Sequence, residues 1–238
     1  MKIKEKILMD REGLEKHGPI NIVIFGDSVS HGAFNGYMDY ERVYWNQLRQ
    51  MLNRYRDFVP INMINASIGG TTAAKSVCRL EKQVLIHQPD LVIVCFGLND
   101  VNGELEEYLD ALRAIFGRIQ AAGTDLIFMT PNMLNTRVAE DTDEYYKCYA
   151  GKTAEMQNSG RMDAFMAAAI ALAQELNVAV CDCYAEWKKR AEREDITLLL
   201  DNRINHPTPE MHTLFAEHLY EMILGETQTD VENDSTMY

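Results

Sequence analysis

The chain has 238 residues, 47% of them hydrophobic, and a formal net charge of −13. A chain of this length and apolar content can bury one substantial core, so we expect a single domain over residues 1–225, followed by an acidic, mobile tail over 226–238. The negative charge argues against binding to nucleic acid or to an anionic membrane surface, because both reward lysine and arginine.

The amino-terminal segment, residues 1–18, carries charges throughout. It lacks the apolar stretch that a secretory signal needs, and no apolar run elsewhere approaches transmembrane length. The five cysteines are odd in number, and Cys95, Cys181 and Cys183 fall in or next to apolar runs, which indicates free buried thiols. These features favour a cytoplasmic location.

Apolar, strand-like runs alternate along the chain with helical patterns. The runs cover residues 20–25, 59–66, 90–96, 124–130 and 177–183. Apolar side chains recur at helical spacing within 44–55, 105–119 and 162–173. Alternating β and α elements predict a parallel sheet covered by helices on both faces, with right-handed crossovers.

The first strand-like run ends at Gly-Asp-Ser. Ser28 follows the apolar residues 22–25 and Gly26, so its hydroxyl is expected where a strand ends and the chain turns. Open α/β sheets bind their ligands at such places. A serine hydroxyl attacks esters poorly unless a positioned base takes its proton. Ser28 is therefore the candidate nucleophile, and the neighbouring Asp27 is expected to cap the backbone that follows.

Two further polar blocks follow the second and third strands. They read NASIGGTT at 65–72 and FGLND at 96–100. Because the carboxyl ends of parallel strands share one edge of a sheet, Gly70 and Asn99 are expected to converge on Ser28. The Gly70 N–H is open to close approach, and the Asn99 amide and the Ser28 N–H are further donors, so the three predict an oxyanion hole. Removing one such donor typically costs about 2.7 to 4 kcal/mol of transition-state stabilisation. Asp100 is expected to cap a helix that begins near Gly103.

The segment 131–160 is long for a connection between a strand and a helix, and loops of that length often form lids or binding segments. Several aromatic side chains are candidates to line a cleft, although ordinary packing explains them equally well. They are Tyr145, Tyr146 and Tyr149 in this segment, and Phe34, Tyr37, Tyr40 and Trp45 after the nucleophile block.

His206 is the candidate base. Pro207 restricts His206 to extended backbone geometry, and a helix is predicted to follow, with Thr208 as N-cap, Pro209 at its first position and Gly225 at its end. The start of this helix is expected to hold His206 on a loop that faces the carboxyl ends of the strands. No clustered His or Asp set has the spacing of metal ligands, and no metal or other cofactor is expected.

The four blocks GDSVS, NASIGG with Gly70, GLND and the late His-Pro resemble those of the SGNH or GDSL-type esterase and lipase family, over about residues 20–225. The resemblance implies Ser28 as nucleophile, Gly70 and Asn99 as oxyanion donors, and His206 as base. It also implies a three-layer α/β/α fold whose five-stranded parallel sheet has the flavodoxin-like order 2-1-3-4-5.

One position departs from the family pattern. The family usually places an aspartate three residues before the histidine, where this chain has Arg203. Asp201 could reach His206 if the loop curls, and would then orient the imidazole and stabilise its cation. The alternative is a Ser-His dyad supported by a main-chain carbonyl. Arg203 is expected to point outward or toward substrate, because a guanidinium aimed at His206 would disfavour the charged ring.

The predicted activity is that of a serine esterase that hydrolyses small acyl esters, such as O-acetyl groups on carbohydrate, through an acyl-enzyme. Two alternatives remain open, acyl transfer at the same site and a non-catalytic module that binds a small ligand. A flavin or phosphate binder is poorly supported, because the loop after the first strand has neither a GxGxxG nor a Walker pattern. The substrate-binding residues, the physiological ester and the oligomeric state are not predicted.

Overall fold

The computed structural model describes residues 1–56 and 58–225, so the predicted tail at 226–238 lies outside the described residues. Five parallel strands form one sheet in the order β2-β1-β3-β4-β5, which confirms the predicted fold. The strands are β1 (Ile20–Gly26), β2 (Ile61–Asn65), β3 (Leu91–Cys95), β4 (Asp125–Met129) and β5 (Ala179–Cys181).

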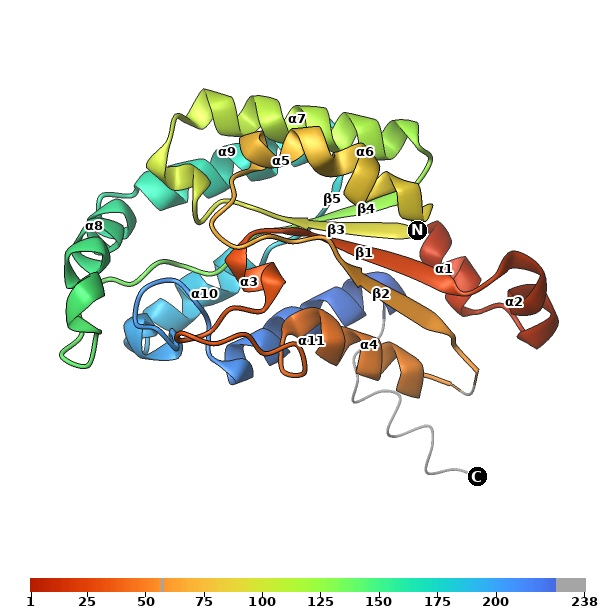
Figure 1. Ribbon diagram of the computed structural model, residues 1–238, viewed down its shortest axis with the longest axis horizontal. Helices are drawn as coiled ribbons and strands as arrows, with labels where there is room; N and C mark the ends of the chain where they lie inside the picture. Colours follow the sequence, from red (N-terminus) through yellow and green to blue (C-terminus); the bar gives the residue numbers. More distant parts are fainter. Residues whose placement is uncertain (57, 226–238) are drawn as a thin grey trace.

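Helices cover both faces of the sheet (Figure 1). One face carries α5 (Ala73–Ser76), α6 (Leu80–Gln83), α7 (Leu105–Ala121) and α9 (Arg161–Glu175). The other carries α4 (Tyr44–Arg54), α10 (Cys183–Ala191) and α11 (Pro209–Leu224). The remaining α-helices lie at the ends of the sheet: α1 (Lys2–Ile7) and α2 (Arg11–His17) at one end, α3 (Ser28–His31) and α8 (Lys147–Asn158) at the other.

Short 3-10 helices complete the described elements: η1 (Val77–Arg79), η2 (Leu85–His87), η3 (Asp100–Asn102), η4 (Glu144–Tyr146) and η5 (Ile196–Leu199).

The two central strands read as continuous apolar runs because both of their faces are covered by helices. Every residue of β3 is buried, and β1 is buried from Ile22 onward. Cys95, Cys181 and Cys183 are free and buried, as predicted. Within the described residues, no helix is both long and apolar enough to cross a membrane.

The carboxyl end of β1 lies unusually close to β3. Gly26 pairs with Cys95 in the parallel register, and a Cβ on Gly26 would lie 2.5 Å from the carbonyl oxygen of Cys95. Only glycine fits such an approach. The chain can therefore turn directly from the centre of the sheet into α3, which carries Ser28.

Helix α11 begins at Pro209 with Thr208 as the N-cap residue and ends at Gly225, which has φ +72°, as the sequence predicts. Its buried face packs against α4 and over the sheet. The loop that carries His206 is thereby fixed at its carboxyl-terminal end by a helix that is part of the core.

Candidate active site

Ser28 is the first residue of the four-residue helix α3, at the carboxyl edge of the sheet. Asp27 caps this helix, because its Oδ1 accepts the Val29 N–H at 3.1 Å, which confirms its predicted capping role. Gly32 ends the helix at φ +98°. The Ser28 N–H belongs to the first turn, where an amide has no partner within the helix. This amide and the hydroxyl of the same residue are thus held in fixed positions.

Ser28 and His206 are brought into direct contact across 178 positions of sequence. Their Oγ and Nε2 atoms lie 3.0 Å apart. The other ring nitrogen, Nδ1, donates to the carbonyl oxygen of Phe34 at 2.7 Å. A neutral imidazole carries one proton, so this bond leaves Nε2 as the acceptor for the Ser28 hydroxyl. Burial lowers the pKa of His206 and favours that neutral form.

The carboxylate of Asp201 does not contact the imidazole of His206. Its Oδ2 instead accepts the Asn35 N–H at 2.8 Å, while the Phe34 carbonyl takes the hydrogen bond of Nδ1. The sequence left open a direct contact from Asp201 or support from a main-chain carbonyl, and the structure has the main-chain contact. The loop does curl, but it brings Asp201 to the far side of the Phe34–Asn35 peptide.

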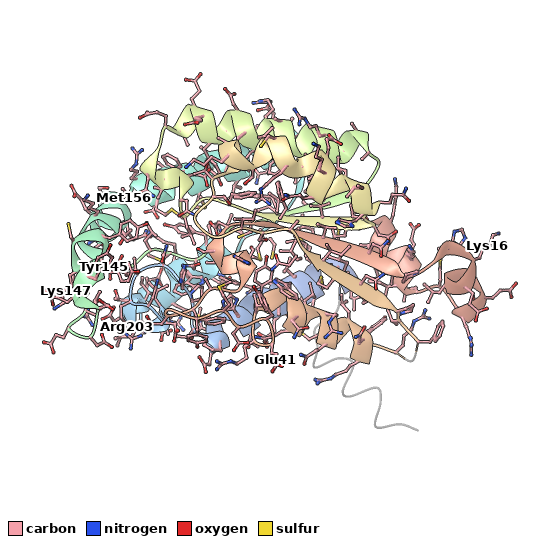
Figure 2. The ribbon with its side chains drawn as sticks, viewed as in Figure 1. Lys16, Glu41, Tyr145, Lys147, Met156 and Arg203 are labelled. Carbon is pink, nitrogen blue, oxygen red and sulfur yellow. The ribbon has the colours of Figure 1, made fainter. Side chains whose placement is uncertain are left out.

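Arg203 points away from the imidazole. Its Nε donates to Asp141 at 2.9 Å, and its Nη1 donates to the carbonyl oxygens of Leu198 and Leu200. With φ +58°, Arg203 has left-handed backbone geometry. Figure 2 shows it at the end of the molecule that also carries Tyr145. Of the two directions predicted for this guanidinium, outward or toward substrate, the structure has the outward one.

Asn202 orders the loop before His206. Its Oδ1 accepts the backbone N–H groups of Ile204, Asn205 and His206 at 3.0, 2.9 and 2.9 Å. Asparagine side chains often bond backbone amides nearby in this way. The role of Asn202 was not predicted, although an asparagine just before a fixed histidine is a pattern that could have indicated it.

The polar blocks after β2 and β3 are bound to each other. Asn99 Nδ2 donates to the Thr71 carbonyl at 3.0 Å, and Asp100 Oδ1 accepts the Ala73 N–H at 2.8 Å. The expectation that Asp100 caps the helix after Gly103 is wrong, since it accepts the first N–H of α5 instead, a helix whose N-cap residue is Thr72. These two bonds hold the segment around Gly70, whose φ of +72° suits a glycine. An amide nitrogen has two hydrogens, so Asn99 keeps one for a ligand.

One cavity of about 600 Å³ joins the predicted site residues. Ser28, Gly70, Asn99 and His206 all line it. Of the aromatic candidates, Phe34, Tyr37, Tyr146 and Tyr149 also line it. Tyr145, Tyr40 and Trp45 do not: Tyr145 is 84% exposed, and the buried Trp45 donates its indole N–H to the Ser30 carbonyl.

Two buried carboxyl groups lie next to Ser28. Asp27 is fully buried and Asp100 nearly so, and each has an Oδ2 atom with no hydrogen-bond partner among the described residues. Burial raises the pKa of Asp27 to about 7 and that of Asp100 to about 6. Each carboxyl uses its other oxygen to accept an N–H at the start of a helix, so both have structural roles that need no charge.

A second histidine close to His206 has a packing role. His212 is fully buried on α11, where it stacks on Tyr44 and accepts the Tyr44 N–H at 3.3 Å. Burial lowers its pKa to about 3. In the described part of the chain, no group of three or more His, Cys, Asp or Glu side chains is arranged to hold a metal ion.

The chain resembles solved esterase structures over most of its length. An acetylxylan esterase from Geobacillus stearothermophilus, Axe2, superposes with a TM-score of 0.69 at 20% identity, covering 88% of this chain and 95% of that one. A second structure, the acetyl xylan esterase AlAXEase, gives a TM-score of 0.67 at 20% identity, with 85% and 99% covered. At this level of identity, the likeness shows the fold.

Sequence comparison identifies the family. A curated relative, the uncharacterized lipoprotein YqeF of Bacillus subtilis, is 30% identical over 95 residues, which span 40% of this chain and only 37% of that protein. The family model for the GDSL-like Lipase/Acylhydrolase family matches residues 24–214. That range includes all four sequence blocks and agrees with the resemblance drawn from them. The chain therefore belongs to the GDSL-like lipase and acylhydrolase family, a family of carboxylic ester hydrolases.

Proposed function

We propose that the protein is a serine esterase that removes short acyl groups, acetyl above all, from carbohydrate hydroxyls. The observation that carries the proposal is the 3.0 Å contact between Ser28 Oγ and His206 Nε2, at the edge of a cavity that also presents Gly70 and Asn99. A nucleophile, a neutral base and amide donors around one cavity are the elements that acyl transfer requires.

The reaction follows from this arrangement. Ser28 Oγ attacks the acyl carbon and passes its proton to His206 Nε2. The resulting oxyanion accepts hydrogen bonds from the Ser28 N–H, the Gly70 N–H and the free N–H of the Asn99 amide. When the intermediate collapses, the proton on His206 goes to the leaving alcohol. A water then attacks the acyl-enzyme, giving its proton to His206, and the acid is released as Ser28 regains that proton.

The composition of the cavity supports a sugar ester as the substrate. Tyr37 and Tyr146 are partly exposed and offer aromatic faces, and Asn202 and Asn205 offer amides. Rings that stack on a sugar and amides that bond its hydroxyls suit a partly acetylated oligosaccharide. The structural neighbours are acetylxylan esterases, which agrees with this choice. The cytoplasmic location stays a prediction from the sequence.

Replacing the nucleophile tests the reaction. In Ser28→Ala, release of p-nitrophenol from p-nitrophenyl acetate should fall by at least about 10³-fold, and a fluorophosphonate should no longer label the protein. Ser30→Ala is the matched control, because Ser30 lies on the same short helix but bonds Tyr44 OH at 2.8 Å and is fully buried. Labelling that persists in Ser28→Ala would refute the assignment.

Substrate class is tested with a series of esters. Rates of release should be highest for acetyl among p-nitrophenyl esters from acetyl to palmitoyl. Acetylated xylo-oligosaccharides should compete with p-nitrophenyl acetate and release acetate. An optimum at long acyl chains would contradict the proposed substrate, and transfer of the acetyl group to an added sugar in preference to water would identify an acyltransferase.

A further inference from the structure

One peptide group lies between the imidazole of His206 and the carboxylate of Asp201. Its carbonyl oxygen, from Phe34, accepts the hydrogen of Nδ1 at 2.7 Å. Its N–H, from Asn35, donates to Asp201 Oδ2 at 2.8 Å. With the Ser28–His206 contact at 3.0 Å, these bonds form a continuous series from the hydroxyl to the carboxylate.

Both sides of this arrangement are held by backbone bonds. Asp201 N–H donates to the His206 carbonyl at 2.7 Å, so the two residues face each other across the base of their loop. The chain just before the Phe34–Asn35 peptide is held by the Ala33 N–H, which donates to the Ser28 carbonyl at 2.9 Å. The peptide is thus fixed to the nucleophile on one side and to the loop of the base on the other.

The electrostatic consequence follows from the dipole of the peptide. A carboxylate at the N–H end makes the carbonyl a stronger acceptor, because hydrogen bonds in series polarise one another in a low dielectric. The Nδ1–H bond strengthens further when the ring becomes cationic during proton transfer. The negative charge of Asp201 also attracts that cation directly and raises the pKa of His206 against the opposing effect of burial.

We propose that Asp201 is a positioning residue that supports His206 through the Phe34–Asn35 peptide, which carries out the task of a directly bonded triad acid. The inference rests on the proposed function, because it assigns His206 the role of base. It explains how the site can work although Arg203 occupies the position where the family usually has an aspartate.

The other charged and titratable groups around His206 do not take this role. On its own loop, Arg203 bonds Asp141 and points away. From α11, His212 is buried, and its uncharged form is favoured. The cavity is also lined by Asp143, which caps η4, and by three tyrosines, Tyr37, Tyr146 and Tyr149. Among these described groups, only the Asp201 carboxylate bonds the peptide that holds Nδ1.

The test is Asp201→Asn in the full-length chain, because an amide oxygen can still accept the Asn35 N–H while the charge is lost. Expected results are a fall in kcat of roughly 10- to 100-fold with KM little changed, smaller than the roughly 10⁴-fold loss for a directly bonded acid. The acid limb of the kcat profile should move to lower pH by on the order of half a unit, because an attractive charge is removed. Thermal melting checks that the variant is folded.

Glu140→Gln is the matched control. It removes the same charge from an exposed position on a neighbouring loop and should keep kcat and the acid limb unchanged. The pKa of His206 is also followed by NMR of its ring protons, assigned with His206→Ala, and it should fall in Asp201→Asn.

The direction in which the pKa of His206 shifts shows whether Asp201 acts through its charge or only by anchoring the loop. If Asp201 only anchored the loop, its loss would expose His206 to water, and the pKa would rise toward 6.5; such a rise would overturn the proposal. An unchanged pKa and kcat would overturn it as well. Wild-type protein without esterase activity, but with the NMR shift intact, would refute the proposed function and leave the peptide link standing.

Discussion

Replacing Asp27 by asparagine should change how the stability of the protein depends on pH. The carboxyl is fully buried next to Ser28, its Oδ2 has no partner among the described residues, and Asp100 lies close enough to repel its charge. Burial first, and Asp100 second, raise the pKa of Asp27 from 3.8 to about 7. The asparagine keeps an oxygen to cap Val29 but cannot ionise.

The sign of the effect follows from linkage. Because the folded-state pKa lies above the unfolded value, the native state retains a proton that the unfolded chain releases between pH 4 and 7. The stabilisation from this proton is complete below about pH 4 and is lost as the pH rises through about 7. A shift of about three units corresponds to about 4 kcal/mol as an upper bound, at 1.36 kcal/mol per unit. From pH 5 to pH 9 we expect the stability of the Asp27→Asn variant relative to wild type to increase by about 2 to 3 kcal/mol, because only the part of the shift between pH 5 and about 7 falls in this range.

Urea unfolding at pH 5, 7 and 9, followed by circular dichroism, measures this difference. Asp110→Asn, an exposed position on α7, is the control and should follow the wild-type curve at every pH. If the difference between Asp27→Asn and wild type were the same at pH 5 and pH 9, the buried carboxyl would not be the group that binds the proton, and the reasoning from burial would fail.

Three further substitutions and one measurement on the wild type have definite expected outcomes. Asn99→Ala should lower kcat for p-nitrophenyl acetate by about 10²- to 10³-fold, since it removes an oxyanion donor; near-wild-type turnover would show that this amide does not contact the transition state. The acid limb of kcat/KM in wild type should lie below pH 6.5, because burial lowers the pKa of His206, and a limb at higher pH would contradict the buried neutral base. Gly26→Ala should destabilise the fold by about 1 to 3 kcal/mol in urea unfolding, because its Cβ would meet the Cys95 carbonyl at 2.5 Å. Gly117→Ala, where a Cβ would meet nothing within 4 Å, should stabilise α7 by about 0.5 to 1 kcal/mol, and equal effects of the two changes would refute the packing argument.

The fold could be predicted because its central strands are marked by composition alone. The buried runs of β1 and β3 cannot be mistaken for half-exposed strands, and both stop where polar blocks begin. The predicted boundaries of the outer strands agree less well with the structure. Strand β2 begins at Ile61, just after Pro60, which has no N–H to donate. Strand β5 begins only at Ala179, because Asn177 has φ +55° and cannot belong to a strand.

The candidate site was predictable where side chains mark it and unpredictable where the backbone does. Ser28 and His206 stand out by residue type and context, and the structure brings them together. The Phe34 carbonyl leaves no trace in the sequence, because every residue has one. Asp100 was assigned to the nearest helix, but its partner amide belongs to Ala73, 27 positions away. Such long-range pairing is decided by tertiary structure.

The segment around Phe34 both lines the cavity and bonds the imidazole of His206. Phe34 and Tyr37 line the cavity and stack on each other at 5.5 Å between ring centroids, while the carbonyl of Phe34 holds His206. A ligand that pushes on these rings therefore pushes on the imidazole as well. The wall that a ligand would contact is thus also the segment that orients His206. Enlarging the cavity at this wall should therefore change kcat together with the affinity for the ligand.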